Sequence, residues 1–151
     1  MMVPVYFHPT LNEAENARVG EFVSRLIWKG EAAVDKFFSM AVFEGQNLVA
    51  GTLYHNWYPE HGVIELSSGS TTKRWLTRRV VQAMFDLPFK ILGCQMVVLR
   101  VSEKNAEMVR IAKSFGFHGK LIPRLRGRDE AEWIFTYTDD QWRSSPYNRE
   151  G

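Results

Sequence analysis

The stretch VIELSSGSTTKRWLTRRVVQAMF, residues 63–85, decides the fold. It starts as a strand-like run, passes through small hydroxylated residues and four cations, and ends in apolar residues at helical spacing. A strand that leads directly into a helix leaves unpaired N–H groups at the helix start, and these favour an anion. Cations at that position oppose the helix dipole, so their number here indicates an anion bound nearby. We therefore interpret residues 70–79 as a site for pyrophosphate.

Side chains of this turn would supply charge and hydroxyl donors to phosphate oxygens. The cations are Lys73, Arg74 and Arg78, and the hydroxyls belong to Thr71, Thr72 and Thr77. The alternative is an ordinary solvated surface, because cations and hydroxyls are common around a helix start.

Periodicity predicts strands and helices on both sides of this stretch. We expect strands at 3–7, 37–43, 48–57, 62–68, 94–101, 117–122 and 130–137, and helices within 10–30, 76–89 and 105–116. The second to fourth strands form an antiparallel meander, and the apolar run at 94–101 is a buried strand parallel to the strand at 62–68. The fold class is therefore α+β, a mixed sheet with helices on both faces.

Capping residues predict where the helices begin and end. Asn12, with Glu15 three residues later, begins the first helix, and Gly30 ends it. Pro88 bends or ends the second helix, and Gly116 ends the third.

Length and composition predict one domain. With 151 residues and 45% apolar content, the chain is long enough for one sizeable core and too short for two. We place the domain at 1–143 and a polar tail without fixed structure at 144–151. No signal peptide or membrane span is found, and the lone Cys94 has no disulfide partner, so we expect a cytoplasmic protein.

Charge is concentrated locally, although the net charge is only +2. Cations cluster at 73–79 and again at 124–128, which suits an anionic small ligand. Nucleic acid is less favoured, because acids flank the second cluster and interrupt any stripe along a phosphate backbone. The four histidines lack the spacing and the cysteine neighbours of a zinc site, so no metal is expected.

The run from 62 to 138 resembles the GNAT superfamily of acyl-CoA N-acyltransferases in its order of elements. VIELSSGS matches the superfamily's central strand, TTKRWLTRR its pyrophosphate turn, and VVLRVSEKNAEMVRIAKSFGF its strand, Asn and helix ending in Gly-Phe. The later half is similar to the branch that includes ribosomal-protein N-terminal acetyltransferases. The resemblance implies a splayed parallel strand pair, acetyl-CoA as cosubstrate, and acetyl transfer to a primary amine. It allows a protein N-terminus or a small amine as acceptor, and it is compatible with a homodimer.

The chain departs from the superfamily's pattern in two features, the pyrophosphate turn and the general acid. The turn usually carries two small residues, at least one of them glycine, where this chain has Trp75 and Thr77. Glycine lets a backbone approach pyrophosphate closely, so we expect a wider turn in which the side chains of Arg74, Thr77 and Arg78 take part. Many members also have a Tyr that protonates the departing thiolate; its position here is Ala112, so the usual general acid is absent.

The resemblance also assigns contacts to the cosubstrate. Backbone N–H groups at Leu66, Ser67 and Ser68 would bind the pantetheine and the thioester. The turn would contribute Thr72, Lys73, Arg74, Trp75, Leu76, Thr77 and Arg78, with Trp75 covering the cosubstrate or closing a substrate pocket. Asn105 would contact the pantetheine arm or, as Asn does without any ligand, only cap its helix.

Glu65 is the candidate base of this site. Acyl transfer from a thioester to an amine needs a neutral amine, an oxyanion donor and a route for protons. If the turn at 58–62 centres near residue 60, His55 lies opposite Glu65 on the same face, and the pair would shuttle a proton. The alternative is that Glu65 faces solvent and His55 is a half-exposed sheet residue.

The sequence is compatible with three functions. The first is the acetyltransferase described above, in which Arg124, Arg126 and Arg128 would attract an acidic acceptor or form only a soluble hairpin tip. The second is a non-catalytic acyl-CoA-binding or interaction module on the same fold, motivated by the two departures. The third, an RNA-associated protein, rests only on the clustered cations and is the weakest.

Overall fold

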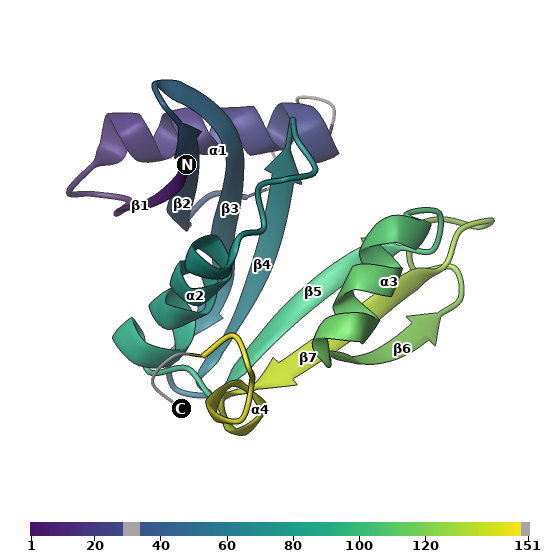
Figure 1. Cartoon of the computed structure of the whole chain (residues 1–151). Coiled ribbons are helices and arrows are strands. Elements are labelled where there is room, and N and C mark those ends of the chain that lie inside the picture. The colour runs from purple at the N-terminus through teal and green to yellow at the C-terminus, as the bar shows by residue number, and fades with distance from the viewer. Residues whose placement is uncertain (29–33, 149–151) are drawn as a thin grey trace.

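A seven-stranded mixed sheet in the order β1-β2-β3-β4-β5-β7-β6 forms the centre of the computed structural model, which describes residues 1–28 and 34–148 (Figure 1). The strands are β1 Met2–Phe7, β2 Phe38–Glu44, β3 Asn47–Tyr58, β4 Val63–Ser70, β5 Met96–Ser102, β6 His118–Ile122 and β7 Glu132–Thr138. The helices are α1 Glu13–Ile27, α2 Arg78–Asp86, α3 Ala106–Phe115 and α4 Asp139–Arg143, with a π-helical turn η1 at Leu87–Ile91. Within the described residues, no helix has the length and apolar content needed to cross a membrane.

The strand pairing confirms the predicted α+β fold. β2, β3 and β4 form the antiparallel meander, and β5 pairs with β4 in parallel. Asn12 stands at the N-cap of α1, but its side chain accepts from the His8 N–H instead of from the helix. Asn105 does cap α3 through its side chain, and Gly116 ends α3 in the left-handed conformation. The predicted helix end at Gly30 lies outside the described residues.

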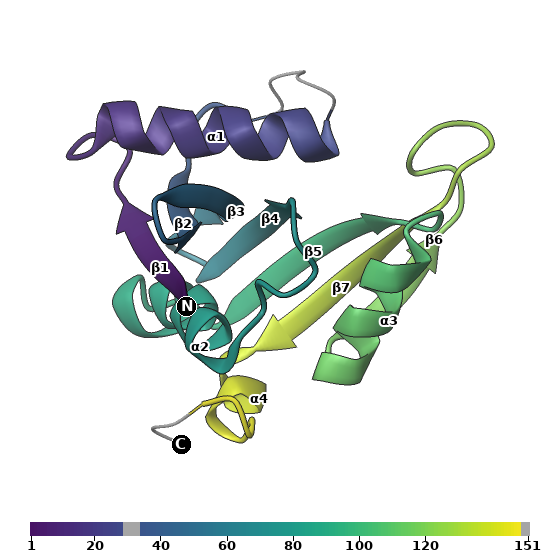
Figure 2. The same ribbon diagram turned by 45° about the horizontal axis from the view of Figure 1, so that its top comes forward.

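Helices cover both faces of the sheet. On one face, Val19 and Val23 of α1 pack with Ala41 and Leu53. On the other face, α2 packs against β-strand residues that include Tyr54, Ile64 and Leu66. Figure 2 shows α1 on one side of the sheet, with α2 and α3 on the opposite side. Successive side chains of β4 point to alternate faces of the sheet.

β4 and β5 separate part-way along their length, and this separation shapes the site. They pair from Val63 and Met96 only as far as Leu66 and Leu99, although β4 stays paired with β3 as far as Ser70. Figures 1 and 2 show the two strands diverging from a common end. β5 is therefore less buried than its apolar sequence predicts: Leu99 is only partly covered because it borders the opening.

The end of α2 explains how the chain accommodates Pro88. A proline has no N–H to donate to the carbonyl four residues earlier, which here belongs to Met84. The Tyr54 hydroxyl donates to that carbonyl at 2.7 Å, and the Tyr6 hydroxyl donates to the neighbouring carbonyl of Ala83. The helix then continues into η1 instead of ending. Two tyrosines from β1 and β3 thus fix the position of α2 on the sheet.

The C-terminal segment includes a short helix at the end of the predicted domain and residues beyond it that contact the domain. Thr138 and Gln141 form a capping box that begins α4, and Trp142 is buried. Beyond α4, the ring of Tyr147 stacks on Phe115 at 5.2 Å between centroids. Residues 144–148 therefore pack against the body of the domain, and the boundary placed at residue 143 stays a prediction.

Candidate active site

Two cavities lie on opposite faces of the sheet and meet where β4 and β5 separate. The first, the α2–α3 cavity, has a volume of about 510 Å³ and lies between β4, α2 and α3. The second, the α1 cavity, has a volume of about 550 Å³ and lies between the end of α1 and strands β3, β4, β5 and β7. Both are lined by Leu66, Ser68, Leu99, Asn105 and Met108. A molecule in one cavity can therefore reach a molecule in the other through the sheet.

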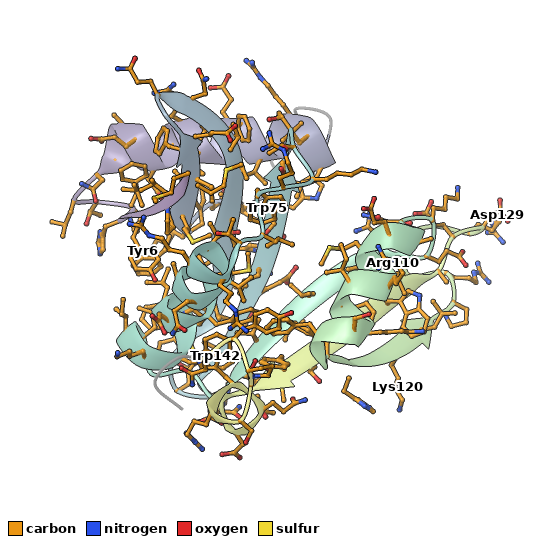
Figure 3. The ribbon with its side chains drawn as sticks, viewed as in Figure 1. Tyr6, Trp75, Arg110, Lys120, Asp129 and Trp142 are labelled. Atoms are coloured by element: carbon orange, nitrogen blue, oxygen red, sulfur yellow. The ribbon has the colours of Figure 1, made fainter. Side chains whose placement is uncertain are left out.

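The α2–α3 cavity collects most of the residues predicted to bind the cosubstrate. Its lining includes Leu66, Ser68, Thr72, Lys73, Trp75, Leu76 and Asn105. Figure 3 shows Trp75 on the connection between β4 and α2. The helix face that carries Met108, Ile111 and Phe115 is only partly buried, because it forms the opposite wall of this cavity. The lining is mainly apolar, and its polar side chains lie on β4, on the turn and at the start of α3, where Asn105 and Glu107 stand. A mainly apolar lining with a few polar groups is typical of small-molecule sites.

Four of the predicted turn ligands, Lys73, Arg74, Thr77 and Arg78, have other partners. The hydroxyl of Thr77 accepts from the Val80 N–H and caps α2. A guanidinium nitrogen of Arg74 lies 3.7 Å from a carboxylate oxygen of Glu44. The Nζ atom of Lys73 lies 4.0 Å from a carboxylate oxygen of Glu107, which also lines the α2–α3 cavity. Among the described lining residues, Lys73 is the cation that this turn presents to the cavity, and its exposed ion pair with Glu107 is weak enough to exchange for a phosphate.

Arg78 instead contacts the C-terminal segment. It donates a hydrogen bond of 2.8 Å to the carbonyl of Pro146, and its guanidinium lies 5.3 Å from the ring centre of Tyr147. The role of Arg78 as a pyrophosphate ligand stays a prediction, as do those of Arg74 and Thr77.

The proposed acid–base pair lies in the α1 cavity. His55 and Glu65 are directly opposite in the β3–β4 register, as the turn length predicted. The Nε2 atom of His55 is 2.8 Å from the Ser67 hydroxyl and 3.9 Å from a carboxylate oxygen of Glu65. A bulge after His55 turns Asn56 to a positive φ of 49°, and its amide donates to the other Glu65 oxygen at 2.9 Å. Glu65 lines the cavity and does not point into open solvent.

His55 is more deeply buried than the alternative interpretation, a half-exposed residue of the sheet, predicts. It is 4% exposed, and Trp28 contacts it edge-on. Its Nδ1 atom is buried and has no hydrogen-bond partner among the described residues. Burial lowers the pKa of His55 below its usual value, and the nearby Glu65 opposes that shift in part. The imidazole is therefore neutral at neutral pH and positions Ser67 and Glu65 without adding charge.

This burial predicts a dependence of stability on pH. Because the pKa of His55 is lower in the folded than in the unfolded chain, the unfolded chain takes up the proton first on acidification. The free energy of unfolding should therefore fall as the pH drops below about 6.5, by at most about 1.4 kcal/mol per pH unit. Denaturant titrations at several pH values should show this loss in the wild type and a flatter profile in His55→Gln. His61→Gln, an exposed turn histidine, should keep the wild-type profile.

The structure also contains a cluster of three charged residues, Arg100, Arg126 and Glu132, that the sequence analysis did not predict. Glu132 is 3% exposed, and it accepts hydrogen bonds from Arg100 at 2.8 Å and from Arg126 at 2.7 Å. All three residues line the α1 cavity. The signal in the sequence was Arg100, a cation inside the apolar run of β5. Of the three loop arginines, only Arg126 lies among the described lining residues of either cavity.

Solved structures share this arrangement of strands and helices. A spermidine N-acetyltransferase from Vibrio cholerae superposes with a TM-score of 0.71 at 13% identity, covering 93% of this chain and 95% of its own. A probable acetyltransferase of the GNAT family from Chromobacterium violaceum superposes with a TM-score of 0.60 at 21% identity, covering 71% of this chain and 61% of its own. The chain has the GNAT fold.

At these identities the likeness establishes the GNAT fold alone. The chain spans less than two thirds of the Chromobacterium violaceum protein. In sequence, it matches no protein-family model and no curated protein. The splayed pair that the GNAT resemblance implied is β4 and β5. The similarity to ribosomal-protein N-terminal acetyltransferases stays a prediction, as does a homodimer.

Proposed function

We propose that this protein is an acetyl-CoA-dependent N-acetyltransferase in which a primary amine attacks the thioester directly. The observation that carries the proposal is the meeting of two cavities at the β4–β5 separation, one on each face of the sheet. Such an arrangement lets a thioester enter from one face and an amine from the other. Direct transfer then needs no covalent intermediate on the protein, and the buried Cys94 is not among the lining residues of either cavity.

The α2–α3 cavity suits acetyl-CoA in size and in chemistry. Its volume lies within the range of small-molecule sites, about 300–1,000 Å³. Beyond Leu66, β4 has no strand paired on its β5 side, so its backbone can bind the amide groups of the pantetheine as a strand would. The connection that includes Thr72 and Lys73 offers hydroxyl and ammonium donors to the phosphates.

The α1 cavity suits the acceptor amine. A primary amine is protonated at neutral pH and must lose a proton before it attacks. Glu65 would accept that proton, directly or through water, while Asn56 holds one of its oxygens. The neutral His55, hydrogen-bonded to Ser67, fixes the geometry behind Glu65. The carbonyl carbon then bonds to nitrogen, the carbon–sulfur bond breaks, and CoA leaves as the thiolate. The nitrogen gives up its second proton through water to the thiolate, which yields the neutral amide and the free thiol of CoA.

Ala112 favours an alternative function, a non-catalytic acyl-CoA-binding module. Ala112 lines the α2–α3 cavity at the position where the resemblance places an acidic Tyr. α3 therefore offers no hydroxyl there to protonate the thiolate. A binding module on the GNAT fold would hold acetyl-CoA in the same cavity without releasing CoA.

An assay for free thiol released from acetyl-CoA distinguishes the acetyltransferase from the binding module. The assay supplies purified protein, acetyl-CoA and a panel of primary amines, and mass spectrometry identifies the acetylated amine. We expect thiol release that depends on both protein and amine, with one acetyl group gained by the amine for each thiol released. Saturable acetyl-CoA binding without release for any amine would support the binding module instead.

A further inference from the structure

The α1 cavity contains a preorganised cationic group formed by Arg100, Glu132 and Arg126, which we call the arginine pair. Arg100 binds one oxygen of Glu132 through Nε at 2.8 Å and Nη2 at 2.7 Å. Arg126 binds the other oxygen through Nε at 2.7 Å. Because Glu132 is buried and held from both sides, it orients two guanidinium groups that would otherwise repel each other.

The arginine pair retains unused hydrogen-bond donors. A guanidinium has five N–H groups, and the bonds to Glu132 use only part of each set. Both terminal nitrogens of Arg126 make no hydrogen bond among the described residues. The side chains of Arg100 and Arg126 are 43% and 35% exposed, so these donors are open to the cavity. With one carboxylate between two cations, the group has an excess charge of +1.

The arginine pair lies within reach of the proposed base. Glu65 pairs with Val98 of β5, and Arg100 follows two residues later on the same face of the strand. Two residues of a strand span about 7 Å. The arginine pair would therefore lie only a few carbon–carbon bond lengths from an amine placed beside Glu65.

We propose that the acceptor is a small amine that also carries a carboxylate, bound by the arginine pair while its amino group lies beside Glu65. The proposal rests on the acetyltransferase function proposed above. Guanidinium groups bind carboxylates through paired N–H donors, so the site recognises shape as well as charge. A polyamine would instead bring a second cation next to Arg100 and Arg126, which costs free energy. The acceptor class thus differs from the spermidine in the name of the Vibrio cholerae protein with the same fold.

The test compares three amines of equal length with different far ends: γ-aminobutyrate, its amide, and putrescine. Thiol release gives kcat and KM for each amine, and calorimetry with the CoA-saturated protein gives binding independently of turnover. Arg126→Gln removes one cation and leaves Glu132 paired with Arg100. Arg128→Gln removes the same charge from the same loop at an exposed residue that does not line the cavity, and it serves as the matched control. Denaturant titration checks that each variant is folded.

We expect the wild type to prefer γ-aminobutyrate. Arg126→Gln should raise its KM and its dissociation constant roughly 10- to 100-fold, the usual effect of losing a hydrogen bond to a charged group. For γ-aminobutyrate, the KM and the dissociation constant of Arg126→Lys should lie between those of the wild type and those of Arg126→Gln. For the amide of γ-aminobutyrate, both constants should stay unchanged in all variants. A preference for putrescine, or an equal loss in Arg128→Gln, would overturn the proposed acceptor and leave the acetyltransferase standing. Carboxylate binding that depends on Arg126, without thiol release for any amine, would keep the arginine pair as a binding site and overturn the transferase.

Discussion

Replacing Glu65 by Gln is expected to lower kcat/KM for acetyl transfer by roughly 100-fold or more, the usual contribution of a positioned general base. Gln keeps the size of the side chain and an oxygen that can accept from Asn56, so the geometry around His55 and Ser67 should persist. What disappears is the group that takes the proton from the attacking amine. The loss should appear in kcat, while the dissociation constant of acetyl-CoA should stay within about twofold, because Glu65 faces the other cavity.

The control for this variant is Glu60→Gln, which removes the same charge from the exposed turn between β3 and β4. It should have wild-type kinetics. A Glu65→Gln enzyme that retains a third or more of the wild-type kcat/KM would show that another group takes the proton.

Phe85→Ala is expected to have the largest effect on stability, a loss of about 3–5 kcal/mol in the free energy of unfolding. Phe85 extends from α2 into an aromatic cluster and is 3% exposed. Its ring centre lies 5.0 Å from that of Trp142 in α4, 5.1 Å from Phe115 in α3 and 5.5 Å from Tyr137 in β7. Phe85 therefore connects α2, which packs on the half of the sheet that ends at β4, to α3, β7 and α4 in the half that begins at β5.

Chemical denaturation measures this effect directly. Total stabilities of domains lie near 5–15 kcal/mol, so the variant should unfold at much lower denaturant. Phe85→Leu should lose less, because it keeps most of the buried volume. Ile91→Ala, at a position 59% exposed in η1, should change stability by less than about 0.5 kcal/mol. A loss below about 1.5 kcal/mol for Phe85→Ala would mean that the two halves of the sheet are held together elsewhere.

The parts of the site that depend on local pattern could be predicted from sequence. The position of the β3–β4 turn predicted that His55 lies opposite Glu65, and the bulge after His55, which the sequence did not indicate, shifts the register by one residue between the turn and this pair. Asn105 and Gly116 bound α3 through capping interactions that follow from residue type. The depth of burial of His55 could not be predicted, because it depends on Trp28 at the end of α1.

The parts that depend on side-chain direction or long-range pairing could not be predicted. Without glycines, the turn between β4 and α2 takes a path that sends Arg74 toward Glu44 and Arg78 toward Pro146. The arginine pair forms only because β7 returns beside β5 after β6, which brings Glu132 next to Arg100.

α4 was missed for a different reason. Its five residues are too few to show a period, although the spacing of Thr138 and Gln141 is that of a capping box. A search for capping boxes after the last strand would have found this helix.

The central claim is that acetyl-CoA binds in the α2–α3 cavity, and calorimetric titration into Met108→Trp tests it most directly. Met108 faces both cavities from α3 and is only partly buried, so a larger side chain there blocks the site without crowding the core. Arg110→Trp places the same side chain on the exposed face of the same helix, at the residue labelled in Figure 3. We predict saturable binding to the wild type and to Arg110→Trp, and a loss of at least about 10-fold in affinity for folded Met108→Trp. Equal affinity in all three proteins, or no binding to the folded wild type, would contradict the account.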